Sequence, residues 1–233
     1  DIMLRNGLTQ NYELSLSGGT EKTVYNVSLG FMNEEGLLRN DNLKRYNGRI
    51  NLDHNLRANL KTGISLLYTH RDWDRRQDGV YTQVIKMHAL AQPRLPDGTI
   101  VDKPSQLALS HTNPLLNEVE GYYQNNTLSD RLFGNVYLDW ELLKGLKFKT
   151  VFGVDHTAAR FGEYEDYMCT GNYQSGRGSY FEVEGRQNMS FTWENTLNYA
   201  INVNDVHDIQ VLLGYSAYEN SIENHKTFGF GLQ

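Results

Sequence analysis

The stretch YELSLSGGTEKTVYNVSLGFMNEEGLL, residues 12–38, alternates apolar and polar residues on both sides of SGGTEKT. The apolar members are Tyr12, Leu14 and Leu16 before the glycines, and Tyr25, Val27, Leu29 and Phe31 after them. Strict alternation is the period of a β-strand, and a Gly-Gly pair between two such runs indicates a hairpin. The apolar side of this hairpin must be covered either by a protein core or by lipid.

Six more alternating runs follow the two strands of this hairpin, so that eight strands are predicted in all. They are expected at approximately 11–17, 23–33, 44–56, 58–71, 129–141, 145–157, 186–202 and 206–219. Several runs are about 12–16 residues long, whereas a strand of a globular protein usually has about 5–6. A strand tilted through a bilayer needs about 9–11 residues within lipid, and more where it continues beyond the membrane.

The connections between these strands alternate in length. Those after the first, third, fifth and seventh strands are tight, whereas NEEGLLRNDN and the segments 72–128 and 158–185 are long. Short turns on one side and long loops on the other are typical of outer-membrane barrels, in which the tight turns are periplasmic. The pattern therefore predicts an all-β, antiparallel, up-and-down transmembrane barrel with both long loops on one side. A soluble β-sandwich, for instance a carbohydrate-binding module, would show the same alternation with one buried face.

The composition excludes several classes of partner and structure. The 233 residues have a formal net charge of −6 and no basic stripe, which argues against a nucleic-acid partner. Cys169 is the one cysteine, so no disulfide can form within the chain. No window approaches 18 consecutive apolar residues, which excludes a transmembrane helix but not membrane strands. The first residues contain no signal peptide and no initiating methionine, and the chain reads as an internal piece of a longer protein.

Residues 12–53 read YELSLSGGTEKTVYNVSLGFMNEEGLLRNDNLKRYNGRINLD. This segment resembles the start of the barrel in SusC/RagA-type TonB-dependent transporters of Bacteroidota outer membranes. The matching positions include the Ser17, Gly18, Gly19 run, Tyr25, and the Arg45, Tyr46, Asn47 run. Phe31 and Glu34 stand where the family pattern has Tyr and Gln. HTNPLL, LLKGLKFKTVFGVD and HDIQVLLGYSAYE also resemble the family, so that the likeness covers nearly the whole chain.

The resemblance implies a barrel of about 22 strands with a plug domain, a TonB-contacting segment and a SusD-like surface lipoprotein as a lid. Residues 1–233 would then be a partial arc of about eight strands from that barrel, without the plug. The implied location is the outer membrane of a Gram-negative bacterium, in contact with its lipid. The implied activity is TonB-dependent uptake of glycans or oligopeptides.

No catalytic or metal-binding constellation is found in the sequence. GYSAY lacks the closing glycine of a nucleophile elbow, and in DWDRRQDG Gln83 stands where a calcium loop needs its bidentate Glu. The histidines are dispersed, and GNYQSGRGS lacks the flanking strand and helix of a phosphate loop. We therefore predict neither an enzyme nor a bound cofactor or metal.

Two sets of candidate binding residues remain. Six polar residues should face the lumen, where they would contact substrate or plug or would pair with one another: Arg45, Arg49, Asp53, Arg71, Arg131 and Asp139. Aromatic residues of the long loops could stack on a ligand or pack on the lid: Trp73, Tyr122, Tyr123, Tyr164 and Tyr167. Helical spacing over residues 81–93 predicts a short helix in the barrel mouth.

Parity also predicts which residues face lipid. Ile50, Leu52, Leu66, Val136, Phe191 and Leu197 should face outward, with Arg49, Asn51, Asn135 and Thr192 inward. Deletion of residues 160–180 is expected to weaken association with the lid and to leave barrel assembly intact.

Overall fold

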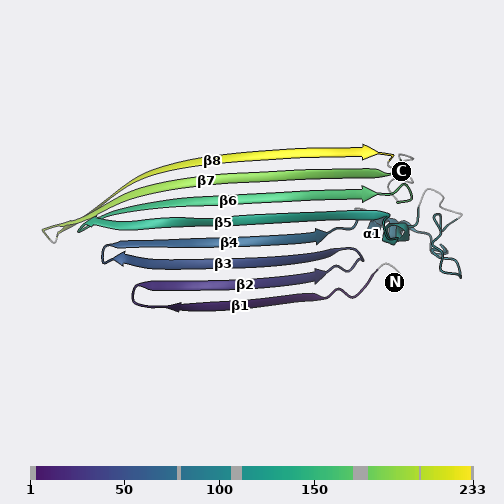
Figure 1. The fold of residues 1–233 in the computed structure, drawn as a ribbon, viewed down its shortest axis with the longest axis horizontal. Helices are drawn as coiled ribbons and strands as arrows, with labels where there is room; N and C mark the ends of the chain where they lie inside the picture. The colour runs from purple at the N-terminus through teal and green to yellow at the C-terminus, as the bar shows by residue number, and fades with distance from the viewer. Residues whose placement is uncertain (1–3, 78–79, 106–111, 170–177, 205, 232–233) are drawn as a thin grey trace.

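The computed structural model describes residues 4–77, 80–105, 112–169, 178–204 and 206–231. Eight strands form one sheet in the order β1 to β8, each antiparallel to its neighbours in the sequence (Figure 1). Their bounds are β1 Thr9–Gly19, β2 Thr23–Glu35, β3 Asn42–Arg57, β4 Leu60–Asp74, β5 Tyr123–Leu143, β6 Leu146–Glu165, β7 Tyr180–Val203 and β8 His207–Phe230. The predicted strand number and up-and-down order are confirmed.

The two faces of the sheet differ as predicted. One register row joins Leu52, Ile64 and Val136 across β3 to β5 and continues through Phe152 and Trp193. Ile50 and Val136 are 47% and 46% exposed, and the described residues contain no second sheet to cover this face. The next row is polar and joins Asn51, Ser65 and Asn135. We call these the apolar face and the polar face.

The apolar residues form a band that runs obliquely to the strands. Leu14, the middle of the band on β1, leads through its successive register partners to Ser221 on β8. The middle of the apolar run on β8 is instead Leu213, eight residues nearer the chain start of that strand. A shift of about one residue per strand, at about 3.3 Å per residue and 4.8 Å between strands, corresponds to a strand tilt of about 40°. Strands of closed barrels tilt by about 35–45°.

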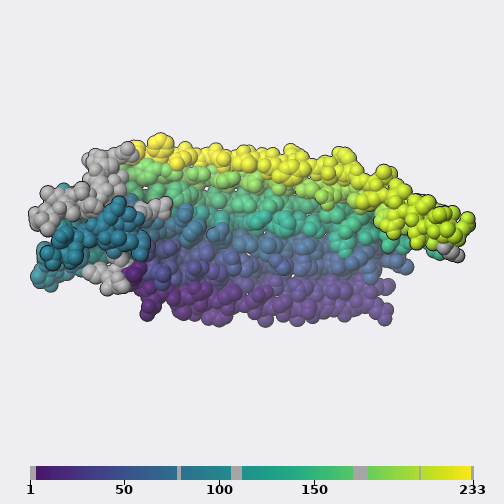
Figure 2. Space-filling view, turned by 180° about the vertical axis from the view of Figure 1, so that it is seen from behind, coloured from purple at the N-terminus to yellow at the C-terminus, as the bar shows by residue number. Residues whose placement is uncertain are grey.

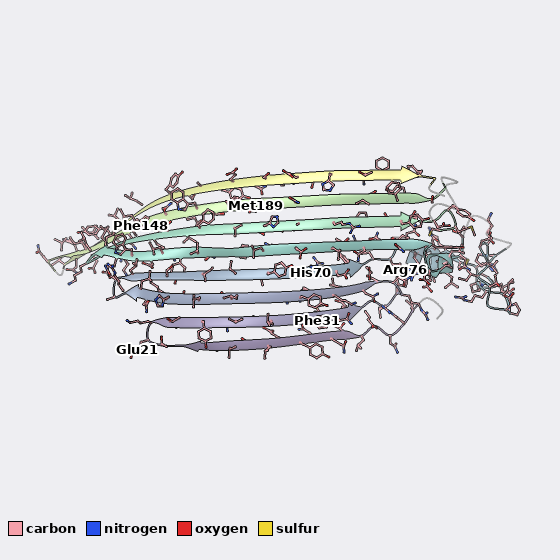
Figure 3. The ribbon with its side chains drawn as sticks, in the orientation of Figure 1. Glu21, Phe31, His70, Arg76, Phe148 and Met189 are labelled. Atoms are coloured by element: carbon pink, nitrogen blue, oxygen red, sulfur yellow. The ribbon has the colours of Figure 1, made fainter. Side chains whose placement is uncertain are left out.

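A line of aromatic rings marks one margin of this band. Tyr12, Phe31, Tyr46 and His70 form a continuous line across β1 to β4, with successive ring centroids 6.3, 5.0 and 6.0 Å apart. Phe31 and His70 are labelled in Figure 3, on the half of the strands that leads toward α1. Aromatic rings at both margins of an apolar band are typical of the membrane interfaces of outer-membrane barrels.

The last four strands are longer than predicted, with 21, 20, 24 and 24 residues. β5 begins at Tyr123 instead of residue 129, and β8 ends at Phe230 instead of residue 219. The long connections are correspondingly shorter than 72–128 and 158–185, and cover residues 75–122 and 166–179. The extensions were missed because their apolar-face side chains are polar or absent, as at Gly162, Glu223 and His225. They continue beyond the apolar band.

Both long connections leave the sheet at the end where β4 and β6 finish, which we call the long-loop end (Figure 1). The opposite, tight-turn end contains connections of two or three residues, with Gly145 at φ 85° and Asn204 at φ 55°. Asp205, in the tight connection that the sequence predicts after the seventh strand, lies outside the described residues. Figure 2 shows the strands as one wall with the residues of the longest connection gathered at one end.

The connection 75–122 folds over the long-loop end around its own small core. Its elements are α1, Val80–Lys86, and the 3₁₀ helix η1, Pro114–Glu118. The helix expected over 81–93 is wrong in extent, because the chain leaves the helix after Lys86 and continues in turns such as that closed by Ala91 N–H on the His88 carbonyl. Val80 and Leu115 are 1% and 2% exposed and form the core. Among the described residues, no helix is long and apolar enough to cross a membrane.

Candidate functional site

The polar face is hollowed from the middle of the strands toward the long-loop end. Four of the six predicted wall residues, Arg45, Arg49, Arg71 and Arg131, line one hollow of about 700 Å³. Its lining extends from Asn11 on β1 to Thr157 on β6, so the sheet curves around this face. The polar face is therefore the concave one, and an inward polar wall is the arrangement of a barrel with a filled or watery lumen.

The other two predicted wall residues lie nearer the tight-turn end. Asp53 accepts a hydrogen bond from Tyr137 Oη at 2.6 Å and pairs with Lys61 Nζ at 3.3 Å. Asp139 stands directly opposite Lys61 in the register. Gly63 allows this cluster to form, because a Cβ there would lie 2.4 Å from the Tyr137 ring.

Within the described residues no ion pair joins two of the six predicted wall residues; Asp53 and Arg131 pair with residues outside that set. Arg131 makes two hydrogen bonds to Asp155, of 2.9 and 2.7 Å. Within the described residues, Arg45, Arg49 and Arg71 have no carboxylate within 4.0 Å. Their charges therefore face the hollow.

The predicted loop aromatics do not converge on one site. Trp73 lies on the polar face under the guanidinium of Arg75, 4.2 Å from the ring centre. Tyr123 lies on the same face but is 8% exposed, and its hydroxyl donates to Glu163 at 3.0 Å. Tyr164 belongs to the apolar-face row of Gln124, and lines a separate hollow of about 310 Å³.

Tyr122 and Tyr167 lie in the connections. The Tyr122 carbonyl accepts a hydrogen bond from the buried Cys169 thiol at 2.8 Å, and burial raises the pKa of that thiol to about 12. The Tyr167 side chain is 59% exposed. Neither lines the two hollows on the polar face that are built from described residues.

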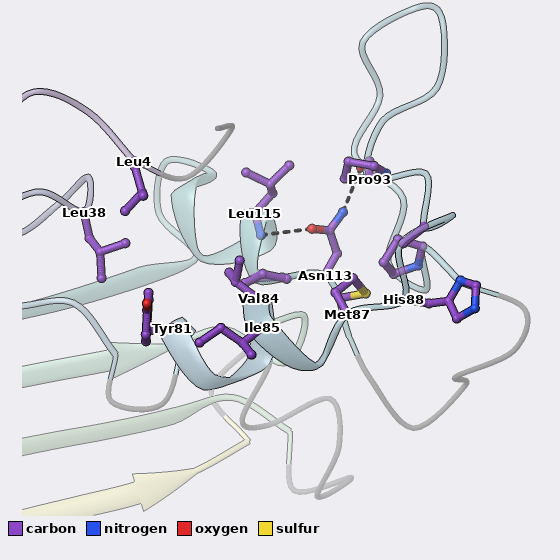
Figure 4. Close-up of a pocket in the computed structure, with 13 residues that line it drawn as sticks. Leu4, Leu38, Tyr81, Val84, Ile85, Met87, His88, Pro93, Asn113 and Leu115 are labelled. Carbon is purple, nitrogen blue, oxygen red and sulfur yellow. Dashed lines mark hydrogen bonds between the residues drawn. The ribbon is translucent and has the colours of Figure 1, made fainter.

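Another cavity, of about 530 Å³, lies within the connection 75–122 and is mainly apolar (Figure 4). Val84, Met87 and Leu115 are among its lining residues. Asn113 holds its wall together: the side-chain amide donates to the carbonyls of Pro93 and Val101 at 2.8 and 2.7 Å, and Oδ1 accepts from Leu115 N–H at 3.1 Å.

A buried ion pair joins the start of this connection, just after β4, to its 3₁₀ helix η1. Arg76 Nη1 lies 3.0 Å from Glu118, with side chains 5% and 12% exposed, and also donates to the Arg39 carbonyl. Arg76 itself is labelled in Figure 3 where β4 leads into the connection. No cluster of three or more His, Cys, Asp or Glu side chains suited to a metal ion occurs among the residues that the structure describes.

Three residues that line the concave face were not among the predicted site residues. Arg75, Arg186 and Asn188 line a hollow of about 370 Å³ next to the first one. Arg186 could have been found by continuing the polar parity of β7, Asn188 to Asn198, two residues further back. Arg75 follows the end of β4, where no periodic signal remains.

Comparison with known proteins assigns this architecture. The chain is 24% identical over 234 aligned positions to TonB-dependent receptor P26 of Formosa agariphila, covering 100% of this chain and 23% of the relative. It is 24% and 25% identical to TonB-dependent receptors P39 and P3 of the same organism, over 93% of the chain in each case. No protein-family profile matches. The chain thus spans about a fifth to a quarter of the length of these relatives.

An oblique apolar band and a concave polar face are the features of an outer-membrane β-barrel wall, and the chain is a homologue of one part of the TonB-dependent receptors. This class comprises transporters and not enzymes. The fold matches the RagAB peptide transporter with a TM-score of 0.74 and 24% identity, over 98% of this chain and 26% of that chain. It also matches the ferric citrate transporter FecA with a TM-score of 0.59 at 9% identity.

Proposed function

We propose that the chain forms part of the wall and the outer rim of a SusC-like importer, which takes up oligopeptides or glycans with energy supplied through TonB. The observation that carries the proposal is the pairing of a lipid-type apolar band with a concave, cationic polar face in a sheet of the RagA type. In this assignment the long-loop end is extracellular and the tight turns are periplasmic.

Oligopeptides are the favoured ligand class, because the structures that the fold matches include those named as the RagAB peptide importer. The plug, reached by TonB, would fill the lumen beside the concave face. The surface for a SusD-like lipoprotein would lie on the connection 75–122, which projects beyond the strand ends at the long-loop end (Figure 1).

Exposed apolar side chains support a partner surface on that connection. Tyr81, Ile85 and Leu90 are 59%, 64% and 85% exposed. They lie beyond the strand ends, so membrane lipid would not cover them. Apolar side chains gathered on an aqueous surface commonly mark a protein interface.

The test uses the full-length protein, tagged and expressed in its own outer membrane. Uptake of a fluorescent oligopeptide mixture should depend on the protein and on TonB, and a surface lipoprotein should co-purify with it. The double variant Ile85→Asp, Leu90→Asp should lower the recovered lipoprotein about tenfold or more, because two charges would be buried in the interface.

The matched control is Thr82→Asp, an exposed residue of the same helix α1. It should leave the recovery of the lipoprotein within about twofold of the unmodified protein. Equal recovery with the double variant would contradict the partner surface. Uptake that persists without the protein or without TonB would contradict the importer.

A further inference from the structure

We propose that the concave face near the long-loop end is an anion-binding groove, centred on Arg71 and Arg186, that selects acidic oligopeptides among the imported ligands. The proposal rests on the importer function above and specifies its ligand. It starts from two adjoining hollows, of about 700 and 370 Å³, which share Arg71, Ser129 and Thr157.

The charge on the lining is one-sided. Six arginines line the two hollows: Arg45, Arg49, Arg71, Arg75, Arg131 and Arg186. The only carboxylate among the lining residues is Glu13, and Asp155 neutralises Arg131 alone. Unpaired positive charge is therefore concentrated in these two hollows of the concave face, although the chain as a whole has a net charge of −6. A concave site of one charge sign concentrates ligands of the opposite sign.

The arrangement also stores like-charge repulsion that the described residues do not relieve. Arg45 and Arg71 stand directly opposite each other on β3 and β4. Like charges in such cross-strand positions destabilise a sheet. Arg45 Nε and Asn188 Oδ1 are buried and have no hydrogen-bond partner among the described residues. A bound anion that also carries hydrogen-bond donors, as a peptide does, would relieve both defects.

The floor of the groove has room for such a ligand. One register row runs from Arg71 through Ser129 and Ala159 to Arg186. Three strand spacings separate the two arginines, which is about 14 Å. Between them lie the Ser129 hydroxyl and the Ala159 methyl group. The groove therefore has an arginine on each side and only short side chains along its floor.

Trp73 adds a second recognition element. Its ring carries Arg75 at 4.2 Å and Arg71 at 5.6 Å, which holds both guanidinium groups at the rim of the groove. Guanidinium groups bind carboxylates through two parallel hydrogen bonds, and stacking on an aromatic ring leaves those N–H groups free at the edge. Several separate guanidinium groups match a ligand with several carboxylates.

The groove lies above the membrane band, at the level where a ligand would enter. On β4, Arg71 directly follows His70 of the aromatic margin, and on β7, Arg186 precedes the first band residues near Met189. This height favours an imported ligand over the plug as the source of the carboxylates.

The experiment measures binding of labelled short peptides to the purified full-length transporter, together with any lipoprotein that co-purifies. One peptide alternates glutamate with alanine, the other glutamine with alanine, and both are capped at the two ends. The glutamate peptide should bind at least about tenfold more tightly at low salt, and the difference should shrink as salt is raised.

The double variant Arg71→Gln, Arg186→Gln should abolish this preference and leave the affinity for the glutamine peptide within about twofold. The matched control is Lys44→Gln, which removes one exposed cation beside Arg45 on the opposite face of β3 and should change neither affinity. Folding of each variant is checked by the heat-dependent mobility shift of the barrel in detergent gels.

The other outcomes overturn the inference in distinguishable ways. Equal binding of the two peptides refutes anion selection while the importer function stands. A glutamate preference that survives in the double variant refutes the groove as its site. Unchanged peptide discrimination with a loosened plug, seen as increased antibiotic entry, assigns the arginines to plug carboxylates. Binding of uronate-containing oligosaccharides but of no peptide refutes the peptide class in both proposals.

Discussion

Leu197 and Asn198 are consecutive residues of β7 that face opposite sides of the sheet. Leu197 belongs to the apolar row with Phe148 and Leu213, whereas Asn198 belongs to the polar row with Lys147 and Leu212. Because the period of a strand is two, the same substitution at these neighbours places a charge once against lipid and once toward the lumen. At the residue scale, this pair separates a membrane wall from a solvated sheet.

We predict that Leu197→Lys destabilises the full-length barrel by about 2–4 kcal/mol, since the lysine would sit near the bilayer midplane. Asn198→Lys, the matched control, should cost less than about 1 kcal/mol because it faces the polar side. Urea unfolding of the protein inserted in lipid vesicles measures both. Equal costs for the two variants would contradict the facing.

At the scale of elements, the connection 75–122 depends on few but well-buried contacts. The Arg76–Glu118 pair joins the end of β4 to η1, and Arg76 has two further nitrogens, Nε and Nη2, buried without partners in the described residues. Removing one member of such a pair leaves a buried uncompensated charge. Substitution of Glu118 should therefore lower the stability of the connection much more than the stability of the strands.

Glu118→Ala is expected to lower the local stability of this connection by about 3–5 kcal/mol. Limited proteolysis of the full-length protein should then cut within residues 75–122 far faster, while the gel mobility of the barrel stays unchanged. Glu120→Ala, an exposed carboxylate two residues away, serves as the control and should leave the cleavage rate as it was. Equal cleavage of both variants would count against the ion pair as the anchor.

Strands within the apolar band were predictable because lipid demands alternation there. The extensions of β5 to β8 were not, since beyond the band both faces meet water or protein and polar residues such as Glu223 fit either face. The helix α1 was predicted too long because the apolar spacing near Met87 and His88 continues after the backbone has left the helix. Parity alone found Arg45 and Arg71, but their lack of carboxylate partners required the three-dimensional register.

On the scale of the whole molecule, the sheet is open: within the described residues β1 pairs only with β2, and β8 only with β7. Unpaired backbone groups at a sheet edge cannot remain exposed within a bilayer, so both edges require partners in the membrane. The tilt of about 40° drawn from the apolar band is the tilt that barrel closure imposes. The geometry of a closed barrel of tilted strands thus accounts for the oblique band, the curvature around the polar face and the exposed apolar face.

The most direct test of this geometry is a spin-label scan along β7 in the full-length protein, with single cysteines from Phe191 to Tyr199 in lipid vesicles, after replacement of Cys169. Labels at odd positions should collide with lipid-soluble oxygen, and labels at even positions with a water-soluble nickel complex or, where the plug covers them, with neither. This period of two should persist through all nine positions. Odd positions shielded from oxygen, as in the core between two packed sheets, would contradict the membrane wall.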